Sequence, residues 1–552
     1  MKIYCLNTSK YVDIKGGDSL KDIYKKIEGE LKFTPICARV NNKTEGLGYP
    51  VFGPKQVEYL SITSSSAQRV YIRSLCMLLY RAAYECFPGS RLKIEHSIAR
   101  GSYCQLLNAG EITAEKVATL KSKMQEYVQR DLPFIRKERI RQDVIEIFRK
   151  QGLEDKVKLL ETNHDIYAVY YSLDGVCDSY YGAMVTSTGV LKVFDLVPYE
   201  KGFLLMGPDK GNPEVPQAPI SQNKIYQAFT EYLMFNNVIG IENVGELNKV
   251  ISSGNAPMLI NVAEALHEKK IVAIADEITE RYHKGGAKIV LIAGPSSSGK
   301  TTTIKRLAIF LATNLLKPKL ISLDNYFVNR VDTPRDETGD YDYESLYALD
   351  LPLFNEHLNT LLSGGEISLP TYDFETGKRT YNGEKLQLEE NSILLIEGIH
   401  GLNPKLTEQV EEKMKYRIYV SALTTLSIDD HNWVPTTDNR LLRRIIRDYR
   451  YRGTSAIDSI RRWPSVRRGE EKWIFPYQEN ADAMFNSSLL FEISVLRDFG
   501  IEILKGVPND APEYSEAYRL LRFLNYFAPL KPDAIPPTSL LREFLGGSSF
   551  KY

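Results

Sequence analysis

The sequence lacks the features that assign a chain to a membrane or to nucleic acid. No uninterrupted apolar run reaches the roughly 18–20 residues that a membrane-spanning helix needs, and the first residues have no apolar core like that of a signal peptide. Lys+Arg and Asp+Glu both total 70, so the overall charge favours neither nucleic acid nor an anionic membrane as a partner. We therefore expect a cytoplasmic protein that binds no membrane.

Cysteine is also scarce. Six cysteines occur among 552 residues, all of them in the first third of the chain and none with Cys-x-x-Cys spacing. This distribution favours reduced, mostly buried thiols over disulfides or a zinc site. The cysteines are Cys5, Cys37, Cys76, Cys86, Cys104 and Cys177.

The residues that are present are typical of a folded protein of about two to four domains. The content of 43% hydrophobic and 25% charged residues is ordinary for such a chain. We predict a multidomain α/β protein. Its predicted parts are a β-grasp-like module at 1–62, an α+β domain at 63–206, a linker and helical segment at 207–283, a parallel-sheet domain at 284–500 and a tail packed on the body at 501–552.

A phosphate-binding loop is the most informative motif. The apolar run 289–293 leads into Gly-x-x-x-x-Gly-Lys-Thr at 294–301, and a helical pattern follows. In this setting Lys300 supplies a positive charge at the β and γ phosphates and the Thr301 hydroxyl can ligate Mg²⁺. We therefore predict a P-loop NTPase fold, a parallel sheet with flanking helices. The predicted nucleotide-binding residues are Gly294, Pro295, Ser296, Ser297, Ser298, Gly299, Lys300, Thr301 and Thr302.

Two further apolar runs each end in a carboxylate. Residues 319–323 lead to Asp324, and residues 392–396 lead to Glu397. Because the carboxyl ends of parallel strands meet at one edge of a sheet, both acids are expected beside the phosphates. Glu397 is placed to hold Mg²⁺, and Asp324 is placed to accept a proton from an attacking hydroxyl or to help hold the metal.

A basic helix is predicted downstream. Arg440, Arg443, Arg444 and Arg447 recur at spacings of three and four, and residues 439–472 contain eleven Lys+Arg against four Asp+Glu. One helical face therefore carries a row of guanidinium groups that could close as a lid over a transferring phosphoryl group. The alternative is a solvent-exposed helix. A nucleic-acid surface is less favoured, because aromatic residues do not alternate regularly with these arginines.

More motifs follow the loop in a fixed order. They are Leu-Asp-Asn-Tyr-Phe at 323–327, Asp-Tyr-Asp-Tyr-Glu at 340–344, Leu-Pro-Thr-Tyr-Asp-Phe at 369–374, Ile-Glu-Gly-Ile at 396–399, Arg-Arg-Ile-Ile-Arg-Asp at 443–448, Arg452-Gly453 and Ala481-Asp482. With these motifs, the region from 289 to about 495 resembles the uridine/cytidine kinases and their phosphoribulokinase relatives.

The resemblance implies an ATP-dependent kinase that phosphorylates a hydroxyl, uses Mg²⁺ and takes a nucleoside as its small-molecule acceptor. It makes Asp324 the general base, also near the metal, and assigns Thr301 and Glu397 to Mg²⁺. The implied catalytic residues are Asp324, Lys300, Arg447 and Arg452, and the implied acceptor-binding residues are Asp342, Tyr372 and Arg444.

Three positions depart from the family pattern at the acceptor. Gly377, Thr454 and Arg462 stand where a histidine, an arginine and a glutamine are expected. Because a site that loses paired hydrogen-bonding groups loses discrimination, phosphoryl transfer is better supported than uridine as the acceptor. A sugar, a polyol or a purine nucleoside remains an alternative.

The N-terminal part has a resemblance of its own. The stretch 67–81, Phe87-Pro88-Gly89, the helix pair within 112–150 and the run 156–160 are similar to the small N-terminal and second domains of threonyl-tRNA synthetases. The editing groups of that family correspond here to Arg73, Met77, Cys177 and Tyr181, so three of the four are missing and we expect no editing. His96, a lone imidazole, is interpreted as structural.

The N-terminal resemblance leaves one alternative from a different class, an RNA-binding regulatory NTPase. tRNA binding is possible in this reading but is not favoured, and the oligomeric state stays open. Salt-dependent tRNA affinity, with ATP hydrolysis that no small acceptor stimulates, would distinguish this protein from a kinase.

Overall fold

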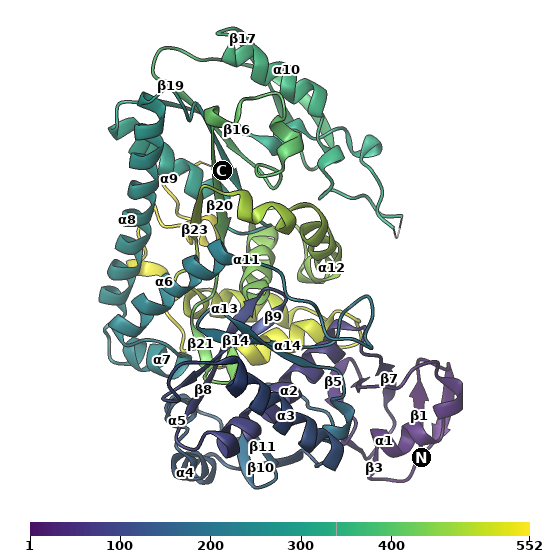
Figure 1. The fold of residues 1–552 in the computed structure, drawn as a ribbon. Helices are drawn as coiled ribbons and strands as arrows, with labels where there is room; N and C mark the ends of the chain where they lie inside the picture. Colours follow the sequence, from purple (N-terminus) through teal and green to yellow (C-terminus); the bar gives the residue numbers. More distant parts are fainter. Residues whose placement is uncertain (338, 552) are drawn as a thin grey trace.

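The structure is a computed structural model that describes residues 1–337 and 339–551. In Figure 1 the first residues form a small lobe at the lower right, the blue segment forms a lower body, and the teal-to-green segment forms an upper body. The yellow C-terminal helices return to the junction between the two bodies. The chain is therefore a multidomain α/β protein, as the sequence predicts.

The N-terminal lobe is a five-stranded mixed sheet packed against one helix. Its elements are β1 (Lys2–Cys5), β2 (Lys10–Asp13), β3 (Asp18–Ser19), α1 (Leu20–Lys25), β4 (Cys37–Val40), β5 (Lys43–Gly46), β6 (Pro50–Val51) and β7 (Gln56–Leu60). The strand order is β2-β1-β7-β4-β5, in which only β1 and β7 are parallel. Ser19 caps α1, because its side chain accepts the N–H of Asp22. Ile3, Leu20 and Val57 are buried in its core.

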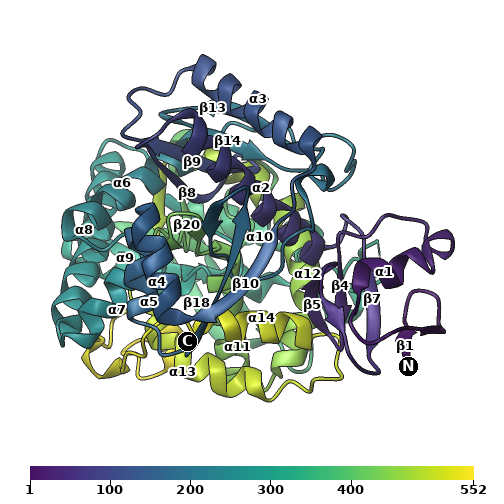
Figure 2. The same cartoon turned by 90° about the horizontal axis from the view of Figure 1, so that it is seen from below.

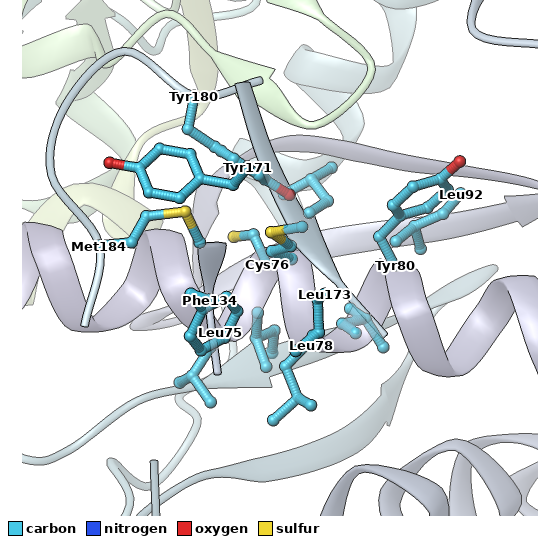
Figure 3. Packing of buried hydrophobic residues seen from close by; sticks show 14 of the residues in the cluster. Leu75, Cys76, Leu78, Tyr80, Leu92, Phe134, Tyr171, Leu173, Tyr180 and Met184 are labelled. Atoms are coloured by element: carbon cyan, nitrogen blue, oxygen red, sulfur yellow. The ribbon is translucent and has the colours of Figure 1, made fainter. Parts of the chain in front are cut away.

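The lower body is built around one long buried helix, α2 (Ser65–Cys86). Its other elements are β8 (Arg91–Ile98), β9 (Gly101–Leu107), α3 (Ala114–Arg130), β10 (Ile135–Ile140), α4 (Arg141–Gln151), α5 (Glu154–Glu161), β11 (Tyr167–Leu173), β12 (Val176–Asp178), β13 (Asp195–Tyr199) and β14 (Gly202–Met206). They form two antiparallel sheets, β13-β14-β9-β8 and β10-β11-β12. Figure 3 shows side chains of α2, among them Leu75 and Leu78, packed with Leu92, Phe134 and Leu173.

The helices predicted in this body are present, but a strand between two of them was not predicted. Thr113 caps α3, since its side chain accepts the N–H of Lys116. The two helices expected between Thr113 and Gly152 are present as α3 and α4. Strand β10 separates them, and no turn-rich stretch in the sequence marks it.

A helical segment leads to the upper body. It consists of α6 (Asn223–Ile239), α7 (Val244–Ser252) and α8 (Ala256–His283). The long α8 stands along one side of the molecule in Figure 1. None of the helices in the described part of the chain combines the length and the apolar character that a membrane crossing requires.

The upper body contains a parallel five-stranded sheet. Its strands are β15 (Ile289–Ala293), β16 (Lys317–Ser322), β19 (Ser392–Glu397), β20 (Lys415–Ser421) and β23 (Ala483–Asn486). The order is β16-β19-β15-β20-β23, and every pair is parallel. The carboxyl ends of β15, β16 and β19 therefore lie side by side, and residues there share one edge.

Helices and two hairpins surround this sheet. They are α9 (Lys300–Thr313), α10 (Leu351–Leu362), hairpin β17 (Glu366–Asp373) and β18 (Lys378–Gln387), hairpin β21 (Ser427–Asp429) and β22 (Asn432–Trp433), α11 (Thr436–Tyr451), α12 (Ala456–Trp473), α13 (Glu492–Lys505), α14 (Tyr514–Leu524) and α15 (Arg542–Leu545). In the view from below, α5 of the lower body lies beside α7 of the helical segment (Figure 2).

Buried charges join the two bodies. The Lys156 ammonium of α5 lies 2.8 Å from a carboxylate oxygen of Asp178 and 2.8 Å from one of Asp429, on the β21–β22 hairpin. His431 pairs with the same Asp178 through Nδ1 at 2.8 Å. Lys156 is 1% exposed, so these charges interact with little solvent screening. We call these four residues the junction cluster.

Candidate active site

The P-loop between β15 and α9 contains left-handed backbone conformations and a close approach to a neighbouring strand. Ser297 and Gly299 are left-handed, with φ of 58° and 84°, and Gly299 is the N-cap of α9. A Cβ on Gly294 would lie 2.0 Å from the carbonyl oxygen of Val420, so no other residue fits there. The loop thus ends at the N-terminus of a helix, where backbone N–H groups and the helix dipole favour an anion.

Two arginines of α11 hold the loop backbone. Arg440 Nε donates to the carbonyl of Ser296 over 2.9 Å, and Arg443 Nη1 donates to the carbonyl of Ser297 over 3.3 Å. Both arginines are buried and ion-paired with buried glutamates. The pairs are Arg440–Glu470 and Arg443–Glu492. The arginine row predicted as a phosphate-facing lid is therefore divided, because these two members are structural.

Lys300 and the two predicted carboxylates lie together at the sheet edge. Lys300 Nζ donates to the carbonyl of Pro295 over 3.1 Å. Burial lowers the pKa of Lys300, while Glu397 and Asp324 act in the opposite direction. Burial and the charge of Asp324 together raise the pKa of Glu397 to about 7, against the opposing effect of Lys300. Glu397 also accepts a hydrogen bond from Ser322 Oγ at 3.1 Å.

This arrangement suits a divalent cation held partly by phosphate. The described residues contain no group of three or more His, Cys, Asp or Glu side chains that could hold a metal. Mg²⁺ is typically bound by one or two carboxylates together with substrate phosphates and water. Asp324 and Glu397, with the hydroxyl of Thr301 directly after Lys300, fit that donor set, and a cation would relieve the mutual repulsion of the two acids.

The loop also has unused hydrogen-bonding capacity. The Ser297 and Ser298 hydroxyls are buried and have no hydrogen-bond partner among the described residues. Buried polar atoms of this kind normally find a partner, so the loop fits a ligand rich in oxygen acceptors, as nucleotide phosphates are.

The other predicted arginines converge on one buried carboxylate. Arg447 Nε donates to Asp448 Oδ1 over 2.8 Å, Arg444 Nε lies 3.3 Å from Asp448 Oδ2, and Arg452 Nε lies 3.7 Å from Oδ1. Arg444 Nη1 also donates to the Ser296 side chain over 2.9 Å. Asp324 influences the pKa of Arg452, so this group borders the carboxylate pair.

The predicted acceptor residues lie on three separate elements: Asp342 on a loop, Tyr372 on β17 and Arg444 on α11. Tyr372 is buried, and its ring packs against Phe327 and Phe374. Its N–H donates to Asn325 Oδ1, next to Asp324, over 3.2 Å. The Asp342 side chain makes no hydrogen bond or ion pair within the described part of the chain, and its N–H donates to the carbonyl of Pro334.

At the position of the missing family histidine, the structure has a glycine covered by an arginine. Gly377 is left-handed, with φ of 69°, and a Cβ there would lie 2.7 Å from Arg330 Nε. Arg330 donates to the carbonyls of Phe374 and Glu375 over 2.6 and 3.4 Å. A histidine therefore does not fit here unless Arg330 moves.

The C-terminal segment contributes a carboxylate that sequence reasoning missed. Thr302 Oγ1 donates to Glu543 Oε2 over 2.7 Å, and Glu543 acts on the pKa of Lys300 and Lys305. A Cβ on Gly299 would lie 2.5 Å from Leu540. No motif marks these residues, because the Thr302–Glu543 contact spans 241 positions.

The four positions that correspond to editing groups do not form a set. Met77 is fully buried in the apolar core. Cys177 is a partly buried free thiol packed against the same core. The Arg73 guanidinium lies 5.5 Å from the centre of the Tyr181 ring, and both side chains line a cavity between the two bodies.

Comparison with known proteins yields two kinds of match. The model of the phosphoribulokinase/uridine kinase family matches residues 289–493. A uridine kinase of Lactobacillus helveticus is 33% identical over 175 residues, which cover 31% of this chain and 72% of that protein. A uridine kinase of Halobacterium salinarum is 30% identical over 192 residues, which cover 35% of this chain and 76% of that protein.

The second match falls in the N-terminal region. A threonine–tRNA ligase of Rubrobacter xylanophilus is 28% identical over 191 residues, 35% of this chain. The aligned part is only 30% of the ligase. The likeness therefore extends to that region and not to the ligase as a whole.

Proposed function

From the premise that the chain belongs to the phosphoribulokinase/uridine kinase family and is an ATP-dependent kinase, we propose that it transfers the γ-phosphoryl group of ATP to a hydroxyl of a nucleoside. The observation that carries the proposal is the meeting of Lys300, Asp324 and Glu397 at the carboxyl ends of the parallel strands. This is the place where ligands bind in open α/β sheets.

In the proposed step the acceptor oxygen forms a bond to the γ-phosphorus while the bond from that phosphorus to the β–γ bridging oxygen breaks. The hydroxyl proton goes to the Asp324 carboxylate, and ADP leaves. Lys300 neutralises charge on the β and γ phosphates, and the P-loop N–H groups bind their oxygens. Asp324 suits this role because it interacts with Lys300 of the loop and forms no close ion pair among the described residues.

Mg²⁺ held by Glu397, Thr301 and Asp324 would neutralise phosphate charge when bound. Arg447 and Arg452 are proposed to turn from Asp448 toward the transferring phosphoryl group, since Arg452 is about half exposed and only loosely paired. Arginine suits this role because its guanidinium binds phosphate oxygens bidentately. Asp342, Tyr372 and Arg444 are proposed to position the acceptor.

A second candidate acceptor is another hydroxylated metabolite, such as a sugar, a polyol or a purine nucleoside. The covered Gly377 favours it, because a histidine that could read a pyrimidine is replaced by backbone and the Arg330 guanidinium. A pocket with changed donors discriminates differently among acceptors by a few kcal/mol.

The test is to incubate the protein with Mg²⁺-ATP and a panel of nucleosides, sugars and polyols, and to follow ADP and phosphorylated product by mass spectrometry. Asp324→Asn is expected to lower kcat by 10²- to 10⁴-fold with little change in ATP affinity, because it removes a proton acceptor and keeps the shape. Lys300→Ala, in contrast, should weaken ATP binding.

A product that is formed equally well by Asp324→Asn would contradict the assignment of the base. ATP hydrolysis that no acceptor stimulates, combined with salt-dependent tRNA binding, would favour the RNA-binding regulatory NTPase instead.

A further inference from the structure

A cavity of about 530 Å³ lies between the lower body and the P-loop domain. Its lower-body wall comes from α2, from the β8–β9 hairpin and from Tyr180 and Tyr181. Its upper wall comes from β20, from the stretch 431–440 and from Pro295 of the P-loop. Lys300, Asp324 and Glu397 are not among the residues that line it. The cavity is thus separate from the proposed catalytic groups, and its volume is in the range of about 300–1,000 Å³ of small-molecule sites.

The charged side chains around the cavity are nearly all positive. The one carboxylate is Asp438, and both of its oxygens accept hydrogen bonds from Arg519, at 2.6 and 2.8 Å. Its negative charge is therefore already neutralised. The cations in the wall are Arg69, Arg73, Arg100, Lys210, Arg440 and Arg467.

Two of these cations have no carboxylate of their own. Arg69, Lys210, Arg440 and Arg467 each form an ion pair with a glutamate. Arg73 and Arg100 form no ion pair with any residue that the structure describes, and Arg73 instead donates to the carbonyl of Ala183 over 2.6 Å. Burial lowers the pKa of Arg73, and the neighbouring Arg69 and Arg519 act in the same direction. An anion beside Arg73 would remove this electrostatic cost.

A neutral polar group completes the wall. His96 is 5% exposed and lines the cavity, and neither ring nitrogen has a hydrogen-bond partner in the described part of the chain. Its ring stacks on Phe229, and burial keeps its pKa well below the usual value, so the imidazole is neutral. A neutral imidazole offers one donor and one acceptor. Orphaned buried polar atoms are rare in proteins without a ligand or water.

We propose that this cavity is a binding site for a small organic anion, whose carboxylate or phosphate pairs with Arg73 and Arg100 while its body packs against Tyr181 and Trp433 and hydrogen-bonds His96. The rings of Tyr181 and Trp433 line the cavity, and the Arg73 guanidinium lies over the Tyr181 ring. This combination of a cation and aromatic faces fits an occupant in which a planar part adjoins the anionic group. A guanidinium group binds carboxylate and phosphate in the same way, through paired N–H···O hydrogen bonds.

The experiment is isothermal titration of the full-length protein with benzoate and with phenyl phosphate, which share a ring and differ in the anion, and with phenol as the neutral control. At least one anion is expected to bind with a Kd below about 1 mM. Arg73→Gln and Arg100→Gln are each expected to weaken it tenfold or more. Arg100 is exposed, so its variant tests the site even if Arg73→Gln folds poorly.

Two control variants locate the bound anion. Lys300→Ala removes the phosphate-binding lysine of the P-loop and is expected to leave the affinity unchanged, as is the exposed Arg136→Gln. Binding that Lys300→Ala abolishes would place the anion at the P-loop and overturn the proposal. Unchanged binding in both cavity variants, or binding by neither anion, would overturn it as well. The measurement does not depend on phosphoryl transfer.

Discussion

Glu344 lies near another carboxylate, that of Glu470, and near Lys300 and Arg444 of the site. Its pKa is raised to about 7 by burial and by the nearby charge of Glu470, against the opposing effect of Arg444 and Lys300. Since this pKa lies above the ordinary glutamate value of 4.5, between about pH 4.5 and pH 7 the folded protein keeps a proton that the unfolded chain has lost. The contribution of Glu344 to the free energy of unfolding therefore falls as the pH rises from about 4.5 to about 7, and it is constant above about pH 7.

Replacement by a neutral isostere should remove this effect. We expect Glu344→Gln to raise the free energy of unfolding by about 1–3 kcal/mol at pH 8, with a difference that narrows as the pH falls toward 5. Denaturant melts of the nucleotide-free protein between pH 5 and 8 measure it, with the exposed Glu356→Gln as the control. A difference that does not vary with pH would contradict the assignment.

Single residues of the site were predictable where a local pattern places them. Lys300, Asp324 and Glu397 each follow a strand that ends at the same sheet edge, and the structure brings them together. Their chemical roles stay predictions. Arg330 was not predictable, because its contact with Gly377 depends on the path of two loops.

Helix α11 presents arginines to two different environments. Helical spacing correctly identifies neighbours along the helix, but it does not reveal which side is buried against α13. Arg443 is 0% exposed and paired with Glu492, whereas Arg447 is paired with Asp448, the carboxylate that Arg444 and Arg452 also approach. One sequence pattern therefore contains a structural and a proposed catalytic arginine.

The two positions should respond differently to truncation. Arg443→Ala leaves Glu492 buried without a partner and is expected to cost about 3–5 kcal/mol of stability. Arg447→Ala leaves Asp448 with Arg444 and Arg452 as partners, so it should cost clearly less stability than Arg443→Ala and lower kcat by about 10²-fold or more. Thermal melts and phosphoryl-transfer rates are the two readouts, with the exposed Arg450→Ala as the control. Equal loss of stability in both variants would count against this division.

Helix α15 adds a negative charge to the nucleotide loop. Glu543 accepts a hydrogen bond from the Thr302 hydroxyl and lies near Lys300 and Lys305. At this place its negative charge repels a polyanionic ligand. Glu543→Gln is expected to tighten Mg²⁺-ATP binding about three- to tenfold, since it removes repulsion and keeps a hydrogen-bond acceptor. Calorimetric titration measures the affinity, and the exposed Glu384→Gln is the control. Weaker binding would instead make Glu543 part of the nucleotide site.

The junction cluster couples the two bodies of the whole molecule. Lys156 lies between Asp178 of the lower body and Asp429 of the upper body, and all three are buried. All three tryptophans, Trp433, Trp463 and Trp473, belong to the upper body. Their fluorescence reports mainly the upper body, although Trp433 also packs against the core of the lower body, while circular dichroism reports both bodies.

Lys156→Met should lower stability by about 3–5 kcal/mol, because two buried carboxylates lose their cation. The fluorescence and dichroism transitions are expected to shift together, although the substitution lies in the lower body. Lys158→Met on the same helix removes only an exposed pair with Glu246 and is the control. A tryptophan transition that stays in place would mean that the bodies unfold independently.

For the whole molecule, the sequence predicts which helices, strands and motifs are present better than it predicts the contacts that join the two bodies. Strands, helices and the P-loop follow from periodicity and turn residues. The joining contacts link positions far apart, such as Lys156 and Asp429, and no spacing rule connects them.

The junction cluster also restricts how such a protein can be assembled from exchangeable parts. Another nucleotide-binding domain fused to this N-terminal half would have to bring a hairpin with an acid and an imidazole in the register of Asp429 and His431. Otherwise Lys156 would keep only Asp178 as an ion-pair partner, and Asp178 would lose His431. A kinase fragment cut at its first motif residue would instead keep Asp429 and His431 without Lys156 and Asp178. Grafting experiments should therefore move the β21–β22 hairpin together with α5.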